Sequence, residues 1–166
     1  MEIGICYSNS MRILVMSDSH GNVPLALQAC DMAGDFDALI HLGDGGEDAE
    51  ILAQALDIKV VHVAGNCDIG SASPRELLLN CEGKKLLLMH GDAYGVKSGL
   101  GLLEKRAREA GVDAVLFGHT HRASVTTLSG ILAVNPGTLT RTTRQRSFAI
   151  LEITPAGISA HLYDIG

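Results

Sequence analysis

The sequence predicts an α/β fold in which two β-sheets pack together with helices on the outside. Short apolar, β-branched runs recur along the chain, and helical patterns separate the first of them. After about residue 112 strand patterns dominate, which favours two packed sheets over one doubly wound sheet. The 166 residues are 46% hydrophobic and 19% charged, a balance that suits a single globular domain.

Eight apolar runs are the predicted strands. They lie at residues 12–17, 38–43, 59–65, 85–91, 114–119, 131–137, 147–153 and 158–164. Helical patterns cover residues 24–33, 47–56 and 100–110. Pro24 is typical of a first helical turn, and Gly111 is a typical stop signal.

Residues 1–10 are predicted to be an upstream extension, with residues 11–166 forming one domain. Met11 opens the first strand pattern directly and is the natural start for it. A native protein whose measured mass begins at Met1 would contradict this prediction.

Composition narrows the functional classes. The net charge is −6 and no basic cluster alternates with aromatic residues, so no stable nucleic-acid complex is expected. The cysteines, Cys6, Cys30, Cys67 and Cys81, form no C-x-x-C pair, which indicates reduced thiols in a cytoplasmic protein. No apolar run reaches the roughly 18 residues of a membrane helix, and the start lacks the pattern of a signal peptide. We therefore expect a cytoplasmic protein with no membrane association.

Five successive runs end in residues of metal-ligand type beside glycine. These residues are Asp18, His20, Asp44, Asn66, His90, His119 and His121. The carboxyl ends of strands are where α/β folds gather ligands. Asp18 and His20 alone could reflect local hydrogen bonding at a turn, but seven such side chains on five run ends exceed chance.

Metal binding would explain this set of side chains. Asp18 and Asp44 would repel each other without a cation, and burying unpaired carboxylates is costly. Seven ligands are too many for one tetrahedral ion but suit two ions that share a bridge. Two ions about 3.5 to 4 Å apart can hold a bridging hydroxide that attacks phosphorus. The residues thus predict a dinuclear metal-dependent hydrolase.

The motifs DSHGN, GD, GNCD, HG, GHTH and NPGT, in this order, resemble the calcineurin-like metallophosphoesterase superfamily. The resemblance is to its small prokaryotic phosphodiesterase branch, and it runs from about Met11 to the C-terminus. It implies a four-layer αββα sandwich of two mixed sheets flanked by helices, with the site at one edge. It also implies a small phosphate-ester substrate and is compatible with a homo-oligomer.

The resemblance implies a role for each ligand. The first ion would be held by Asp18, His20 and His121, the second by Asn66, His90 and His119, and Asp44 would bridge them. The residues expected to be catalytic are Asp44, Asn66 and His90. Two divalent ions per chain are implied; manganese is favoured, and the mixed nitrogen and oxygen ligands also accept nickel, iron, zinc or cobalt.

Cys67 is where this sequence departs from many members of the family, which have a histidine after the GN pair. A thiol with an ordinary pKa near 8.5 is a poor general acid, so packing near the site is the favoured role for Cys67. Asp68 either orients His20 or a neighbouring ligand, or caps the following turn; the sequence leaves both open.

Other polar residues have less specific expectations. Arg141 would bind the substrate phosphate if it lies near the site, but its surroundings equally fit a solvated loop. His41 and His62 lie on apolar runs and are expected in the core or in support of the ligands. Asn135 is expected to fix its loop near the site.

Two other functions compete with a phosphodiesterase. A eukaryotic retromer subunit is similar in fold to this branch but works as a protein scaffold, so the fold alone does not decide. A scaffold would have no need of seven intact ligand positions. A dinuclear hydrolase acting on another bond is the third alternative. The sequence does not distinguish a cyclic nucleotide, a nucleic-acid fragment and a small diester as substrate.

Overall fold

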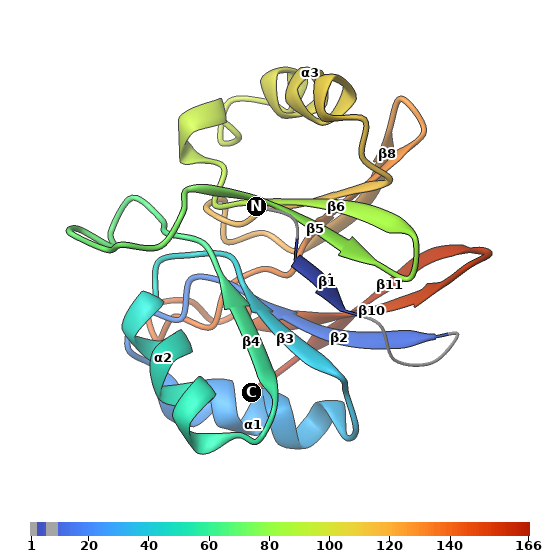
Figure 1. The fold of residues 1–166 in the computed structure, drawn as a ribbon. Helices are drawn as coiled ribbons and strands as arrows, with labels where there is room; N and C mark the ends of the chain where they lie inside the picture. The colour runs from blue at the N-terminus through green and yellow to red at the C-terminus, as the bar shows by residue number, and fades with distance from the viewer. Residues whose placement is uncertain (1–2, 6–9) are drawn as a thin grey trace.

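The computed structural model describes residues 3–5 and 10–166, and they form two packed β-sheets with helices on both outer faces (Figure 1). One sheet has six strands in the order β1-β5-β6-β7-β9-β8: Ile3–Ile5, Glu76–Cys81, Lys84–Met89, Ala114–Leu116, Ile131–Asn135 and Ser124–Leu128. The other has five in the order β11-β10-β2-β3-β4: Gly157–Asp164, Ser147–Thr154, Met11–Met16, Ala38–His41 and Lys59–His62. The helices are α1 (Val23–Ala33), α2 (Gly46–Ala55), the 3-10 helix η1 (Asp92–Tyr94) and α3 (Gly101–Ala110).

Strand β2 shows how the sequence builds the layers. Its side chains alternate between two buried faces, as expected for a strand covered on both sides. Ile13 and Val15 point into the core between the sheets, whereas Leu14 and Met16 pack in the cluster that includes α1 and α2. Helix α3 covers the outer face of the six-stranded sheet. The predicted four-layer αββα sandwich is confirmed.

The topology brings the predicted ligand loops to one edge. Strands β2, β3 and β4 are parallel neighbours in one sheet, and β6 and β7 are parallel neighbours in the other. Parallel neighbours end at the same edge of a sheet. The loops that follow these five strands carry all seven predicted ligands, so the site is assembled from both sheets.

The three predicted helices are confirmed, with Pro24 in the first turn of α1 and Gly111 ending α3. Strands β5 and β8 were not predicted. Each forms a hairpin with the strand after it, through the two-residue turns Glu82–Gly83 and Ser129–Gly130. All four turn residues have positive φ, but neither pair is the Asn-Gly or Asp-Gly sequence that usually signals such a turn.

The first residues are described only in part. Strand β1 pairs in parallel with β5, whereas residues 1–2 and 6–9, Cys6 among them, lie outside the described residues. The upstream extension at residues 1–10 stays a prediction. Cys30, Cys67 and Cys81 are free thiols. Within the described ranges, no helix has the length and apolar character that crossing a membrane requires.

Candidate metal centre

Five of the seven predicted ligands have a left-handed backbone. The φ angles are 53° at Asp18, 45° at His20, 54° at Asp44, 67° at His119 and 59° at His121. Non-glycine residues rarely adopt this region, and each instance costs of the order of 1 to 3 kcal/mol. Such strain persists where surrounding contacts enforce it, so its concentration in these loops marks a built site.

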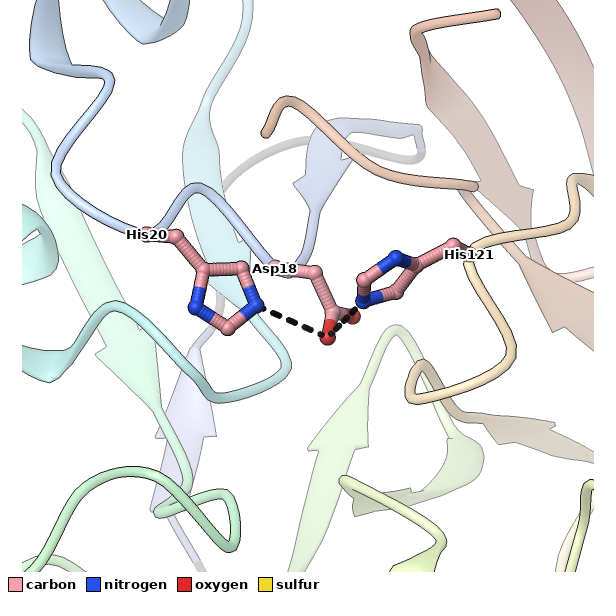
Figure 2. Close-up of side chains that lie close together, drawn as sticks. All are labelled: Asp18, His20 and His121. Carbon is pink, nitrogen blue, oxygen red and sulfur yellow. Dashed lines mark hydrogen bonds and ion pairs between the residues drawn. The ribbon is translucent and has the colours of Figure 1, made fainter. Parts of the chain in front are cut away.

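The first group of side chains is Asp18, His20 and His121 (Figure 2). Asp18 Oδ1 lies 3.0 Å from His121 Nε2 and 3.7 Å from His20 Nε2. Burial alone would raise the pKa of the enclosed Asp18 carboxyl, but its contacts with the histidines and with Ser17 hold that pKa far below its usual range. Asp18 is therefore an ionised carboxylate that faces two imidazole nitrogens.

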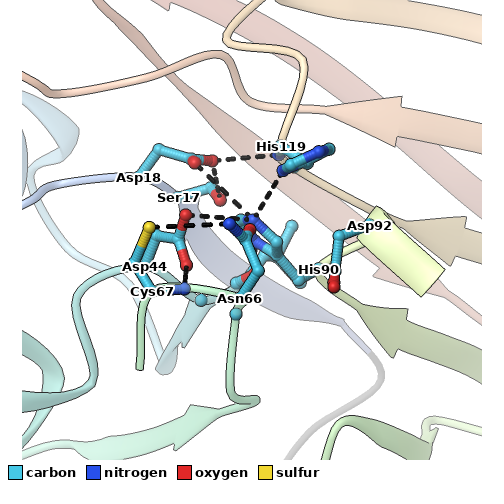
Figure 3. Close-up of polar contacts among 12 residues, drawn as sticks. Ser17, Asp18, Asp44, Asn66, Cys67, His90, Asp92 and His119 are labelled. Carbon is cyan, nitrogen blue, oxygen red and sulfur yellow. Dashed lines mark hydrogen bonds and ion pairs between the residues drawn. The ribbon is translucent and has the colours of Figure 1, made fainter. Parts of the chain in front are cut away.

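The second group is Asp44, His90 and His119 (Figure 3). His90 Nε2 lies 3.3 Å from Asp44 Oδ2 and 3.2 Å from His119 Nδ1. The other nitrogen of His90, Nδ1, donates a hydrogen bond of 2.8 Å to the Leu42 carbonyl. That bond fixes the ring with Nε2 toward the group, which is the arrangement found for metal-binding histidines.

Asp44 connects the two groups. Its Oδ2 lies 3.8 Å from His20 Nε2 on one side and 3.3 Å from His90 Nε2 on the other. Burial would raise the pKa of Asp44, but His90 and the Cys67 backbone N–H lower it to about 2. Asp44 is thus ionised and lies between His20 of the first group and His90 of the second.

Asn66 and Cys67 lie beside Asp44 in the loop after β4. The Asn66 side-chain amide is 3.5 Å from Cys67 Sγ, and the Cys67 backbone N–H donates to Asp44 Oδ1 at 2.8 Å. Cys67 Sγ is within 4.8 Å of ligand atoms of His20 and Asp44. Cys67 lies near the site, as expected, but its side chain is exposed and not packed in the interior. Desolvation and the Asp44 carboxylate raise the pKa of its thiol.

Asp68 holds the loop that carries Asp44. Its carboxylate accepts backbone N–H groups of Asp44, Gly45, Gly46 and Gly65 at 2.8 to 3.1 Å. Burial opposes ionisation, but these donors keep the pKa of Asp68 below its usual value. Asp68 also lies at the start of α2, where a negative charge is favourable. Of the two roles left open, orienting a neighbouring ligand is the one that the contacts support, and that ligand is Asp44 rather than His20.

A buried hydrogen-bonded chain supports the loop of His20. Burial lowers the pKa of His41 to about 4, so its ring is neutral at pH 7. His41 Nδ1 accepts the Gly43 N–H at 3.2 Å, which leaves Nε2–H to donate to Ser19 Oγ at 2.8 Å. Ser19 in turn donates to Asp48, which also accepts the Gly21 N–H. The expected supporting role of His41 is confirmed.

Several supporting residues were missed in the sequence. Ser17 Oγ donates to Asp18 Oδ2, and Thr138 Oγ1 donates to the Asp18 carbonyl at 2.9 Å. Ser19 and Asp48 were also missed. Only Thr138 carried a signal, as the last residue of the NPGT motif; the others are common residue types without a distinguishing pattern.

The remaining candidates lie around the site. Asn135 donates to the Gly118 carbonyl and to Thr120 Oγ1, and its Oδ1 accepts the Gly137 N–H, so it fixes its loop as expected. His62 contacts Ser73 Oγ at 3.2 Å. Arg141 is exposed on the turn before β10, and its contact with a phosphate stays a prediction.

The donor set fits divalent metal ions. Each group offers carboxylate oxygen and imidazole nitrogen atoms within 4.8 Å of one another. The bond to Leu42 turns His90 Nε2 toward His119 Nδ1, so that the two ring nitrogens lie 3.2 Å apart. Convergence of such atoms on ionised Asp18 and Asp44 is the arrangement that a cation stabilises.

The chain is similar to known phosphoesterases in sequence. Residues 11–155 match the model of the calcineurin-like phosphoesterase superfamily domain. A probable metallophosphoesterase from Bacillus subtilis is 38% identical over 157 residues, which cover 93% of this chain and 91% of the relative. A phosphodiesterase from Methanocaldococcus jannaschii is 25% identical over 144 residues, which cover 76% of this chain and 83% of the relative.

Solved structures share the fold. A structure described as a novel archaeal phosphodiesterase has a TM-score of 0.76 and 20% identity, covering 93% of this chain and 100% of the other. Vps29 from Entamoeba histolytica, solved with zinc, has a TM-score of 0.74 and 22% identity, covering 93% of this chain and 99% of the other. At these identities the similarity is one of fold.

Proposed function

The chain belongs to the calcineurin-like phosphoesterase superfamily, and on that premise we propose that it is a phosphodiesterase that uses two divalent metal ions. The observation that carries the proposal is the position of Asp44 between two groups of ligand atoms. One group of ligand atoms contains Asp18 and the other contains Asp44, and Asp44 also lies 3.8 Å from His20 of the first group, so the arrangement suits two ions better than one.

We assign the proposed ligands to the two ions as the family resemblance implies. Asp18, His20 and His121 would hold one ion, and His90, His119 and Asn66 the other, with Asp44 shared. Two ions held there would supply Lewis-acid activation of water and neutralise charge on the phosphoryl oxygens. The chain's own contribution is to hold these side chains rigidly, through Leu42, Ser17 and Asp68. Manganese remains the favoured ion; the ligand types also suit nickel, iron, zinc or cobalt.

Diester specificity is supported by the Methanocaldococcus jannaschii relative, which is called a phosphodiesterase. We therefore propose that diesters are the main substrates and that monoesters react more slowly. Many members of the family that the sequence resembles have a histidine at the position of Cys67, so esters with poor leaving groups should react slowly here whether they are diesters or monoesters.

A scaffold on the same fold is the second candidate, because Vps29 proteins share the architecture. The ionised Asp18 and Asp44 carboxylates and the strained ligand loops favour the enzyme. A surface used only for binding a protein would not require five left-handed residues around buried carboxylates.

Hydrolysis of bis(4-nitrophenyl) phosphate tests the proposal. Metal-stripped protein should be inactive, and manganese should restore cleavage of the diester at a higher kcat/KM than that of 4-nitrophenyl phosphate. Folded protein that cleaves neither ester with any of manganese, nickel, iron, zinc or cobalt would favour the scaffold.

Replacing Cys67 by serine should leave at least about half of the diesterase rate. The contact between Cys67 and Asp44 uses the backbone N–H, which serine keeps. Steady-state rates on bis(4-nitrophenyl) phosphate check this, and a loss as large as that of an Asp44 variant would assign the thiol a catalytic role.

Replacing Gly65 by alanine should weaken manganese binding by at least roughly tenfold. An alanine methyl group at this position would lie 2.1 Å from Asp44 Oδ1 and 2.6 Å from its backbone nitrogen, so Asp44 must move. Isothermal titration calorimetry measures the affinity. Gly101→Ala in α3 is the matched control, because its added methyl group meets no atom within 4 Å. Equal affinity in both variants would contradict the required position of Asp44.

A further inference from the structure

A cleft of about 500 Å³ is lined in part by the loop that carries His119 and His121. Val96, Leu100 and Phe117 supply apolar lining, and Lys97, Thr120 and Arg122 supply polar groups. Val96 and Phe117 are buried, whereas Lys97 and Arg122 are exposed. Thr120 stands between the predicted ligands His119 and His121 in the chain, so one loop contributes residues to both the cleft and the site. We call it the Lys97–Arg122 cleft.

This shared loop is held in place. Asn135 Nδ2 donates to Thr120 Oγ1 at 2.9 Å, and the Arg122 backbone N–H donates to the same oxygen at 3.1 Å. Asn135 Nδ2 also donates to the carbonyl of Gly118, the residue directly before His119, at 3.1 Å. These hydrogen bonds hold the loop that contributes to both the cleft and the site in one position.

Lys97 and Arg122 are the two cations of the cleft. Among the residues that the structure describes, no ion pair engages Lys97 or Arg122. Arg75 and Arg106, by contrast, pair with Asp92 and with Glu76. In a protein of net charge −6, two unpaired cations beside an apolar cleft suit an anionic ligand.

The groove on the other side of the site has the opposite charge. It has a volume of about 550 Å³, and its lining includes Glu47, Asp48, Glu50 and Asp68 but, within the described chain, no lysine or arginine. His20 and Asp44 also line it, so it too opens on the metal centre. An additional anion on a substrate would be repelled from this groove and attracted to the Lys97–Arg122 cleft.

We propose that the Lys97–Arg122 cleft binds one ester group of the substrate and that this group carries a second phosphate on an apolar, nucleotide-sized body. The proposal rests on the proposed phosphodiesterase function. A simple diester has one negative charge, which the metal centre would take up, so it leaves the two cations of the cleft unused. The acidic groove then receives the other ester group, which carries no additional negative charge.

A matched pair of substrates tests this subsite. Thymidine 5′-(4-nitrophenyl phosphate) and its 3′-phosphorylated derivative differ only in the second phosphate. Wild-type protein with manganese should cleave the 3′-phosphorylated ester with a kcat/KM roughly tenfold higher, and the preference should shrink as salt is added. The double variant Lys97→Gln, Arg122→Gln should reduce the ratio of the two kcat/KM values to about one.

Lys105→Gln with Arg108→Gln is the control, because it removes the same charge from exposed positions of α3 that line neither the cleft nor the site. It should keep the full preference. Equal kcat/KM for both esters in wild-type protein, or a preference that persists in the Lys97 and Arg122 double variant, would overturn the subsite. In either case, cleavage of bis(4-nitrophenyl) phosphate would leave the proposed function intact, whereas failure to cleave it would refute that function separately.

Binding gives a second readout that needs no turnover. Thymidine 3′,5′-bisphosphate should bind wild-type protein more tightly than thymidine 5′-monophosphate by roughly tenfold in calorimetry. The Lys97 and Arg122 double variant should lose this difference, and the control variant should keep it. No difference between the two nucleotides in wild-type protein would count against the subsite.

Discussion

Asp44→Asn is expected to lower kcat/KM for bis(4-nitrophenyl) phosphate by at least roughly 100-fold. Asp44 Oδ2 faces both His20 and His90, at 3.8 and 3.3 Å, so a single change disturbs both groups of ligand atoms. An amide keeps the shape of the side chain but removes the negative charge that two cations would share. The loss should therefore exceed that for any ligand that belongs to one group only.

Steady-state kinetics and metal titration of the same variant measure this effect. Asp57→Asn makes the same chemical change at an exposed position beyond the end of α2, and it should leave both quantities unchanged. Near-normal turnover by the Asp44 variant would refute the bridging role of this carboxylate.

Asp68→Ala is expected to lower the free energy of unfolding by about 2 to 4 kcal/mol and kcat/KM by more than tenfold. The change leaves four backbone N–H groups without their acceptor, among them those of Asp44 and Gly65. It also removes a negative charge from the start of α2. The Asp44 loop should then lose the support that fixes its left-handed conformation.

Chemical denaturation and diester kinetics measure the two losses. Asp68→Asn keeps one acceptor oxygen and should fall between wild type and Asp68→Ala in both. Wild-type stability and activity in Asp68→Ala would show that other contacts suffice to hold the loop.

The strands and helices that position the site could be predicted because their patterns are strong. Strand β2 has four consecutive buried apolar residues, and α1 and α3 have a clear start and a clear stop, respectively. Strand β8 is mostly exposed and contains only Val125 and Leu128 as apolar residues, so its pattern is weak. Strand β5 was missed although it contains three leucines, since leucine favours a helix as readily as a strand.

The candidate ligand residues could be predicted from the sequence, but the residues that hold them in place could not. Asp18, His20, Asp44, His90 and His119 were recognisable because metal-ligand residue types recur at strand ends. The role of Asp68 depends on backbone N–H groups that only the folded loops bring together. The left-handed conformation of five of the predicted ligand residues was not predicted either, because non-glycine residues rarely adopt it. At Gly65 the absence of a side chain matters because Asp44 lies against it.

The central claim, a two-ion centre that cleaves phosphodiesters, is tested most directly by counting ions and turnover in the same samples. Manganese is titrated into metal-stripped protein, and bound metal and bis(4-nitrophenyl) phosphate hydrolysis are measured at each step. The account predicts two ions bound per chain, with full activity only when both are present. Fewer than two ions per chain at saturation, or no hydrolysis by folded protein with both ions bound, would contradict it.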